Sequence, residues 1–213
     1  MGIEDDALEQ QLIARDPDAR LMVQVRNDVV GAFETLVERY QNRLLAILFH
    51  MVGNLEEAED LCQEVFLRVY KARKGYRPRA RFSTWLFTIA NNLAINHLRS
   101  KGRNPSVSLQ GGTDSRTAAA VGQYLTGREG TPSSQMRQAE LADLVKDALG
   151  VLNEDQKMAV LLNKFEEMSY AEIADVMSRS PAAVKSLLAR ARNQLREQLE
   201  TYLTTGQRGD VGS

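Results

Sequence analysis

Cysteine and histidine are nearly absent from this chain of 213 residues, which holds one cysteine, Cys62, and two histidines, His50 and His97. A single cysteine excludes an internal disulfide framework and is typical of a reducing cytoplasm. No set of cysteines and histidines has the spacing of a structural zinc site. Carboxylate clusters with metal-ligand spacing and nucleophiles beside a base are missing too. We therefore expect no enzyme, no catalytic residue, no metal and no cofactor.

Long apolar runs are missing as well. The most hydrophobic stretch, residues 44–52, is interrupted by His50 and falls short of the roughly 20 residues that span a bilayer. The amino terminus, MGIEDDALEQ, lacks the basic and apolar blocks of a secretory signal. The composition, 43% hydrophobic and 26% charged, is ordinary for a globular chain. We expect a cytoplasmic protein of one or two domains without membrane insertion.

Acidic residues are absent between positions 65 and 103, where ten Lys and Arg occur although the whole chain has a formal net charge of −1. Charge segregated in this way predicts a polyanionic partner. Rings beside phosphate-seeking cations suit single-stranded bases. The alternative is a solvated helix face with ordinary core aromatics. The aromatic residues in this stretch are Phe66, Tyr70, Tyr76, Phe82, Trp85 and Phe87.

The periodicity of apolar residues predicts an all-α fold. Helices are expected over about residues 29–52 and 55–74, and Asn54 followed by Glu57 forms the N-cap signal of the second. Ser83 is the expected cap of a third helix that runs through Arg99, with Phe82 and Phe87 in hydrophobic-staple positions.

Composition changes from about residue 101, where Gly, Ser, Thr and Arg replace periodic apolar residues. Such a stretch predicts a flexible linker between two small helical domains. We expect an acidic extension at 1–24, a helical domain at 25–103, the linker at 104–137, a second helical domain at 138–200 and a tail at 201–213.

The second domain carries the spacing of a helix-turn-helix. Ser169 and Glu172 form a capping box for a short helix, and Ser180 with Pro181 supplies an N-cap and a first-turn proline. Two helices joined by so tight a turn are typical of DNA-binding domains. An antiparallel helical hairpin with a basic outer face is the alternative. The apolar spine of the second helix is Val184, Leu188, Ala191 and Leu195.

The face opposite that spine combines small and basic residues. Small side chains permit close approach to base edges, while Lys and Arg reach phosphates or guanine. This face consists of Ala182, Lys185, Ser186, Ala189, Asn193 and Arg196, with Arg190 at its margin.

The helix after residue 83 has a polar side as well. Trp85 lies off the apolar stripe, and a tryptophan beside asparagines can stack on a base or, alternatively, pack under the preceding loop. The other residues on this side are Thr88, Asn92, Asn96 and Arg99.

Four motifs together resemble the second conserved region of bacterial RNA polymerase sigma factors of the extracytoplasmic-function group: DLCQEVF at 60–66, YRPRARFSTWL at 76–86, IANN at 89–92 and NHLR at 96–99. Residues 169–196 are similar to the fourth region of that group. The resemblance implies a dissociable subunit that binds core polymerase, recognises a minus-35 duplex and a minus-10 single strand, and helps to open the promoter. It also allows an anti-sigma protein as a partner.

The resemblance assigns each site to particular residues. Asp60, Gln63 and Glu64 would dock on the coiled coil of the largest polymerase subunit, although they also form the exposed face of an amphipathic helix. The loop at 74–81 would receive a flipped nucleotide. The minus-10 residues would be Lys74, Tyr76, Arg77, Arg79, Arg81, Phe82, Trp85, Asn92, Asn96 and Arg99. The minus-35 residues would be Ser180, Ala182, Ala183, Lys185, Ser186, Ala189 and Arg190.

Departures from the family pattern leave the promoter sequence open. Leu187 stands where arginine is common, Ala182 and Ala183 replace a frequent Gly-Thr, and the loop is unusually basic. The rival interpretation is a helix-turn-helix repressor or activator that binds duplex operators unaided. A repressor has no need of the polar stripe at Asp60, Gln63 and Glu64, which favours the polymerase subunit.

Overall fold

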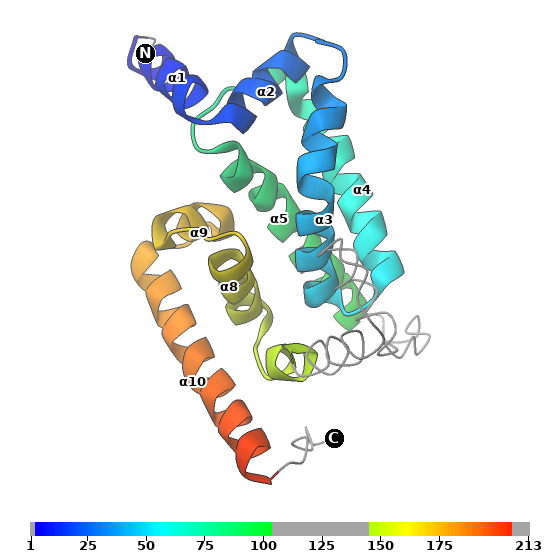
Figure 1. The fold of residues 1–213 in the computed structure, drawn as a ribbon, viewed down its shortest axis with the longest axis vertical. Coiled ribbons are helices and arrows are strands. Elements are labelled where there is room, and N and C mark those ends of the chain that lie inside the picture. Colours follow the sequence, from blue (N-terminus) through cyan, green and yellow to red (C-terminus); the bar gives the residue numbers. More distant parts are fainter. Residues whose placement is uncertain (1–2, 104–144, 206–213) are drawn as a thin grey trace, which may run out of the picture.

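The computed structural model of this protein describes residues 3–103 and 145–205, so the predicted linker at 104–137 lies outside the described residues. The described residues form helices and turns without a strand, which confirms the all-α class. Figure 1 shows one group of helices from α1 to α5 and a second group that ends with α8, α9 and α10.

A helical hairpin forms the centre of the first domain. Gly53 ends α3 (Ala32–Val52) in the left-handed conformation, with φ at 75°, which glycine adopts without steric cost. The predicted cap then begins α4 (Leu55–Ala72), because the Asn54 side chain accepts the N–H of Glu57 at 3.0 Å. A short 3₁₀ turn, η1 (Arg73–Gly75), follows. Leu36, Leu44, Leu48 and Val65 are fully buried in this domain.

Helix α5 (Phe82–Arg103) begins one residue before its predicted cap, Ser83. The N–H of Phe82 donates instead to the carboxylate of Asp16 at 2.7 Å. Phe82 and Phe87, the predicted staple pair, are both buried. Local sequence patterns could not reveal this cap, since its acceptor lies 66 residues away along the chain.

The amino-terminal segment forms two helices, α1 (Ile3–Arg15) and α2 (Pro17–Arg26). Asp16 caps α2 by accepting the N–H of Asp18 at 2.9 Å, and Pro17 occupies the first turn. The acidic composition predicts an extension at 1–24 outside the first domain, whereas the structure buries Ala19 and Met22 completely in the core of that domain. The packed region therefore extends back to Asp16.

The second domain contains the predicted helix-turn-helix. Residues 145–150 are helical, and α8 (Glu154–Phe165) and α9 (Tyr170–Met177) each begin with a capping box. Ser178 takes the left-handed conformation at the turn, with φ at 53°. Helix α10 (Pro181–Thr205) then starts, with the Ser180 hydroxyl accepting the N–H of Ala183 at 3.2 Å. Val184, Leu188 and Ala191 of the predicted spine are buried, and Leu187 is buried beside them.

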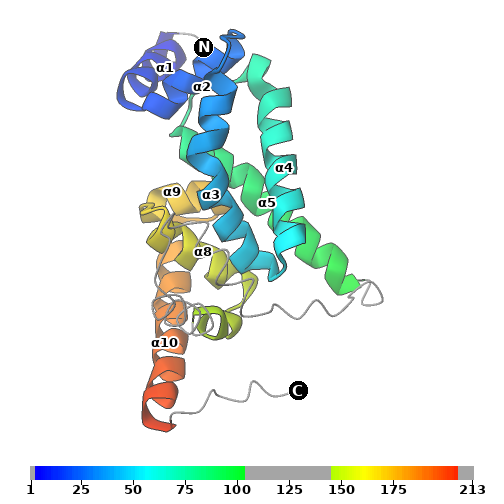
Figure 2. The same ribbon diagram turned by 45° about the vertical axis from the view of Figure 1, so that its right-hand side comes forward.

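The two domains pack against each other over a continuous apolar core. Helix α9 lies against α5 and α8 lies against α3, as both ribbon views show (Figures 1 and 2). The guanidinium of Arg43 on α3 binds both carboxylate oxygens of Glu166 at the end of α8. The rings of His50 and Phe165 lie 5.8 Å apart at the same junction. Sequences of the separate helices contain no sign of this contact.

Candidate nucleic-acid interface

A cleft of about 940 Å³ lies beside the loop that joins η1 to α5. Four of the predicted minus-10 residues line it, namely Tyr76, Arg77, Arg79 and Trp85. Both arginines are exposed and Trp85 is half-buried, so cations and an aromatic ring face the same space. This combination suits a single-stranded base that stacks on a ring while its phosphates meet guanidinium groups.

A cluster of aromatic rings supports Trp85 from below. The Trp85 ring lies 4.9 Å from that of Tyr76 and 5.9 Å from that of Phe82, measured between centroids. Phe82 is completely buried and contacts the ring of Tyr40 at 5.2 Å. Among the predicted minus-10 residues, Phe82 therefore lies in the core beneath the cleft, where it orients Trp85.

Tyr76 lines the cleft but exposes only 4% of its surface. Burial raises the pKa of its phenol, and the negative charge of Asp16 raises it further, so this group stays neutral. The Tyr76 hydroxyl oxygen has no hydrogen-bond partner within the described part of the chain. The buried ring thus forms a rigid wall of the cleft.

Several residues outside the predicted minus-10 set also line the cleft, and two of them are informative. Thr84 lies one position before Trp85, is buried, and its hydroxyl has no partner among the residues that the structure describes. Asp175 comes from α9 of the second domain, and so its presence depends on the packing of the two domains. No pattern around residue 85 could have indicated an acidic side chain from another domain.

The remaining minus-10 residues lie outside this cleft. Asn92 and Asn96 are exposed one turn apart on α5, which places both on the same helix face. Arg99 lines a different cleft of about 540 Å³ with Leu152 and Glu154 of the second domain. Arg81 is exposed, and its Nε lies 3.4 Å from Oε1 of Glu172 on α9.

Lys74 makes contacts within the protein. Its ammonium group donates to the backbone carbonyl of Arg26 at 3.0 Å and binds a carboxylate oxygen of Asp28. The hydrogen bond from Lys74 holds the pKa of the exposed Asp28 carboxyl below its usual value. Lys74 is therefore occupied by an intramolecular pair in this structure.

The predicted polymerase-binding stripe is accessible on α4. Asp60 and Gln63 are exposed, and Gln63 lines a shallow groove between α3 and α4. Glu64 pairs with Arg68 at 2.8 Å, and that hydrogen bond lowers the pKa of its carboxyl. Leu67, an exposed apolar side chain with 51% of its surface accessible, continues the stripe and was not selected from the sequence. Cys62 borders the groove, and burial raises the pKa of its thiol to about 12.

The outer face of α10 carries the predicted minus-35 residues. Ala183 is half-buried, and the other six are exposed. The exposed six are Ser180, Ala182, Lys185, Ser186, Ala189 and Arg190. Because Ser180 caps the helix, its side chain is already committed to the N–H of Ala183. The face combines small residues with two cations, Lys185 and Arg190, as the sequence predicts.

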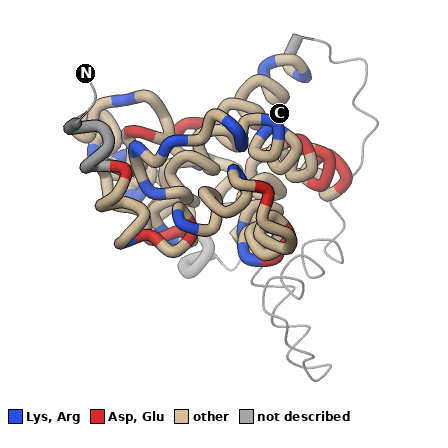
Figure 3. Tube along the Cα trace, turned by 90° about the horizontal axis from the view of Figure 1, so that it is seen from above, with Lys and Arg blue, Asp and Glu red and all other residues tan. Residues whose placement is uncertain are grey.

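Charges of both signs are spread over the molecule. Figure 3 shows Lys and Arg (blue) and Asp and Glu (red) interspersed along most of the described trace. In the described ranges, no three His, Cys, Asp or Glu side chains form a group that could hold a metal ion. No helix at 3–103 or 145–205 combines the length and the hydropathy needed to cross a bilayer.

Two family models match this chain. The model of Sigma-70 region 2 matches residues 36–104, which cover the α3–α4 hairpin and α5. The model of Sigma-70, region 4 matches residues 142–195, which cover the helix-turn-helix. The two matches therefore fall within the two packed domains and contain the predicted site residues, while α2 lies before the first match.

Curated relatives are similar over most of the chain. The RNA polymerase sigma-H factor of Pseudomonas aeruginosa is 32% identical over 197 residues, covering 90% of this chain and 98% of the relative. The ECF RNA polymerase sigma-E factor of Haemophilus influenzae is 33% identical over 186 residues, covering 87% of this chain and 97% of the relative.

Solved structures share the fold. CnrH, solved in complex with the cytosolic domain of CnrY, has a TM-score of 0.62 and 22% identity, covering 87% of this chain and 99% of that one. The sigma factor RpoE of Bartonella quintana was solved with the anti-sigma factor NepR. It has a TM-score of 0.60 and 23% identity, covering 80% of this chain and 98% of that one.

Proposed function

Because the chain belongs to the sigma-70 family of bacterial RNA polymerase sigma factors, in its extracytoplasmic-function group, we propose that it is a dissociable promoter-specificity subunit. It binds core polymerase in the cytoplasm, recognises a minus-35 duplex and a minus-10 single strand, and helps to open the promoter. It performs no bond chemistry itself.

The cleft beside the loop at 76–81 carries this proposal. A flipped base needs an enclosed ring to stack on and cations to hold its phosphates, and Trp85, Arg77 and Arg79 border one space. Asn92 and Asn96 lie further along the same helix, with amide groups that can hydrogen-bond base edges or phosphates. These features favour a separated strand over a duplex as the ligand of the first domain.

The outer face of α10 supports duplex recognition by the second domain. A helix enters the major groove when its contact face is narrow, and the alanines at 182 and 189 keep the face of α10 narrow. Lys185 and Arg190 then reach guanine edges or phosphates.

The stripe on α4 supports docking on polymerase. Asp60 and Gln63 offer polar groups, and Leu67 adds an exposed apolar contact one turn further along the same helix face. An interface that combines an apolar centre with a polar rim is typical of a specific protein contact.

We also propose an anti-sigma protein as a partner. The sigma factor RpoE of Bartonella quintana, which shares the fold of this chain, was solved with the anti-sigma factor NepR. In this chain, a cleft of about 370 Å³ at the domain junction, lined in part by Phe49 and Leu149, offers an apolar wall to such a partner.

In vitro transcription tests the proposal. Core polymerase with this chain, supplied with fragmented genomic DNA, should start transcripts at discrete sites that share two upstream elements, and sequencing of the RNA identifies them. The double change Asp60→Ala with Glu64→Ala should abolish both these transcripts and co-elution with core, while Glu56→Ala on the same helix should preserve them. Sequence-specific duplex binding by the free chain, with no transcripts from the reconstituted enzyme, would establish a repressor instead.

A further inference from the structure

The loop that borders the cleft is held at both ends by one segment from the amino-terminal part of the chain. Residues 76–81 have no regular structure and connect η1 to α5. Helix α2 and its flanking residues, 16–28, contact the chain just before this loop and just after it. We refer to residues 16–28 as the α2 strut.

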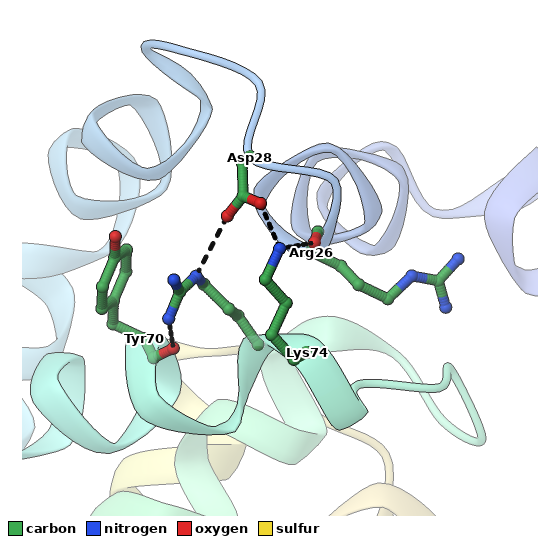
Figure 4. A network of polar contacts seen from close by, with 5 residues as sticks. Arg26, Asp28, Tyr70 and Lys74 are labelled. Carbon is green, nitrogen blue, oxygen red and sulfur yellow. Dashed lines mark hydrogen bonds and ion pairs between the residues drawn. The ribbon is translucent and has the colours of Figure 1, made fainter.

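Three polar groups of the strut hold the entrance of the loop. The carboxylate of Asp28 accepts a hydrogen bond from the ammonium of Lys74 (Figure 4). Its Oδ1 lies 3.5 Å from Nε of Arg73. The backbone carbonyl of Arg26 accepts from Lys74 at 3.0 Å. The guanidinium of Arg26 donates to the carbonyl of Tyr76 at 2.9 Å and thus fixes the first loop residue.

One carboxylate of the strut holds the exit. Oδ2 of Asp16 accepts the N–H of Phe82, the first residue of α5, at 2.7 Å. Its other oxygen accepts the N–H of Asp18, so that a single side chain caps α2 and α5 together. Charged acceptors at a helix start also interact favourably with the helix dipole.

The strut is stiff and of defined length. Helix α2 has ten residues, about 15 Å at the rise of an α-helix, and its buried residues anchor it to the core. Its two ends, Asp16 and Arg26, are the points that meet the exit and the entrance of the loop. The strut therefore sets the distance between the loop ends.

We propose that the α2 strut positions the minus-10 loop, so that Asp16, Arg26 and Asp28 control strand recognition without touching DNA. This inference rests on the proposed function of the cleft. The three residues act through Tyr76 and Phe82, which orient Trp85, and through Lys74. They are positioning residues, and Lys74 belongs with them.

Simple electrostatics makes the opposite prediction for Asp28. An exposed carboxylate near the cationic cleft repels DNA, so removing its charge should tighten binding if charge alone matters. If Asp28 positions the loop, removing the charge removes one of the contacts that hold Lys74 and Arg73, and binding should weaken. The sign of the change separates these two roles.

The test uses polymerase reconstituted from core and the full chain, carrying either the parent protein, Asp28→Asn or Glu38→Gln. Glu38 is an exposed carboxylate on α3, so Glu38→Gln removes the same charge from the same domain. The probe is a pool of short single-stranded DNA oligonucleotides of random sequence, and bound molecules are sequenced. A duplex pool of random sequence reports the second domain.

We expect Asp28→Asn to bind the single-stranded pool about two- to fivefold more weakly than the parent, the range expected for an exposed ion pair, with reduced base preference. Binding of the duplex pool and the far-ultraviolet dichroism should match the parent. Unchanged or tighter single-strand binding, as expected for Glu38→Gln, would overturn the proposal, and so would an equal loss on both pools. Failure of the parent to select any single-stranded sequence would refute the proposed function itself.

A double-mutant cycle with Lys74→Ala gives an independent check. If Lys74 acts through Asp28, the double variant should bind the single-stranded pool as weakly as either single variant. Losses that simply multiply would assign Lys74 to DNA contact and overturn its role in the strut.

Discussion

At the scale of single residues, Tyr76 lines the cleft with its ring while its hydroxyl makes no hydrogen bond within the described part of the chain. Its ring lines the cleft and contacts Trp85, yet its hydroxyl is buried without a partner among the described residues. A buried unpaired hydroxyl costs free energy that a phenylalanine would not.

We therefore expect Tyr76→Phe to retain the free energy of unfolding of the parent or to increase it slightly. Tyr76→Ala should lower it by about 3–5 kcal/mol, because the large ring leaves a cavity. Urea denaturation measures both. If Tyr76→Phe instead weakens single-strand binding at unchanged stability, the hydroxyl contacts a base and the wall function is wrong.

Lys185 is the residue that best isolates duplex recognition. It is exposed on the outer face of α10, away from the buried spine. We expect Lys185→Ala to weaken binding of polymerase to its selected duplex by roughly 1–3 kcal/mol if it contacts a base, and less if it contacts only phosphate. Lys164→Ala, an exposed lysine on α8, serves as the control. A quantitative filter-binding titration should show no change with the single-stranded probe.

At the scale of elements, Glu57 joins the start of α4 to the end of α5. Its carboxylate accepts from Nζ of Lys101 at 2.7 Å and lies 2.9 Å from Nε2 of His97. Burial raises the pKa of Glu57, but the hydrogen bonds from Lys101 and His97 outweigh burial and hold the pKa below its usual value. His97, on the apolar side of its helix, is thus a paired histidine.

This pairing predicts a pH-dependent contribution to stability. A lowered pKa means that the folded state favours the charged carboxylate, so the contribution is present above pH 4.5 and is lost as the pH falls through the lower folded value. Glu57→Gln should therefore unfold at a lower urea concentration than the parent at pH 7. The two proteins should converge as the pH falls below 4.5; a constant difference would mean that packing, and not charge, makes the contribution.

At the scale of the whole molecule, the junction between the domains holds a buried charge. The Glu166 side chain is only 1% exposed, while its partner Arg43 is half-exposed. Burial raises the pKa of Glu166, and pairing with Arg43 offsets part of that rise. Removing Arg43 would leave a buried carboxylate without its cation.

We expect Arg43→Ala to lower the free energy of unfolding by about 1–3 kcal/mol at pH 7, less than for a fully buried pair because Arg43 is half-exposed. Since the folded pKa of Glu166 lies above its usual value, protonation stabilises the junction. The deficit should shrink as the pH falls toward 4.5. Arg39→Ala, which removes an exposed pair with Asp18, should show a smaller and less pH-dependent loss. An equal loss in both variants would contradict the role of the buried carboxylate.

The domain contact also affects access to the cleft. Asp175 of α9 lines the cleft and Glu172 lies beside Arg81, so the second domain presents acidic groups where DNA phosphates would lie. Distances between fluorophores on α5 and α10 should therefore increase when polymerase binds DNA.

The sequence alone determined the helix-turn-helix of the second domain and its capping box at Ser169 and Glu172, because these depend on residues three or four positions apart. Apolar periodicity was sufficient to predict the two helices of the hairpin, expected at about 29–52 and 55–74 and observed at 32–52 and 55–72, and the spine of α10. The basic, aromatic loop and the face around Lys185 were likewise evident from local composition.

Only the tertiary structure decided which residues share the cleft and what holds it in place. Asp16 caps α5 from 66 residues away, Asp28 pairs with Lys74, and Asp175 arrives from the other domain. Such contacts depend on how whole helices pack, and no local pattern encodes them. For the same reason, the sequence does not reveal that Phe82 is buried beneath the cleft or that Lys74 pairs with Asp28.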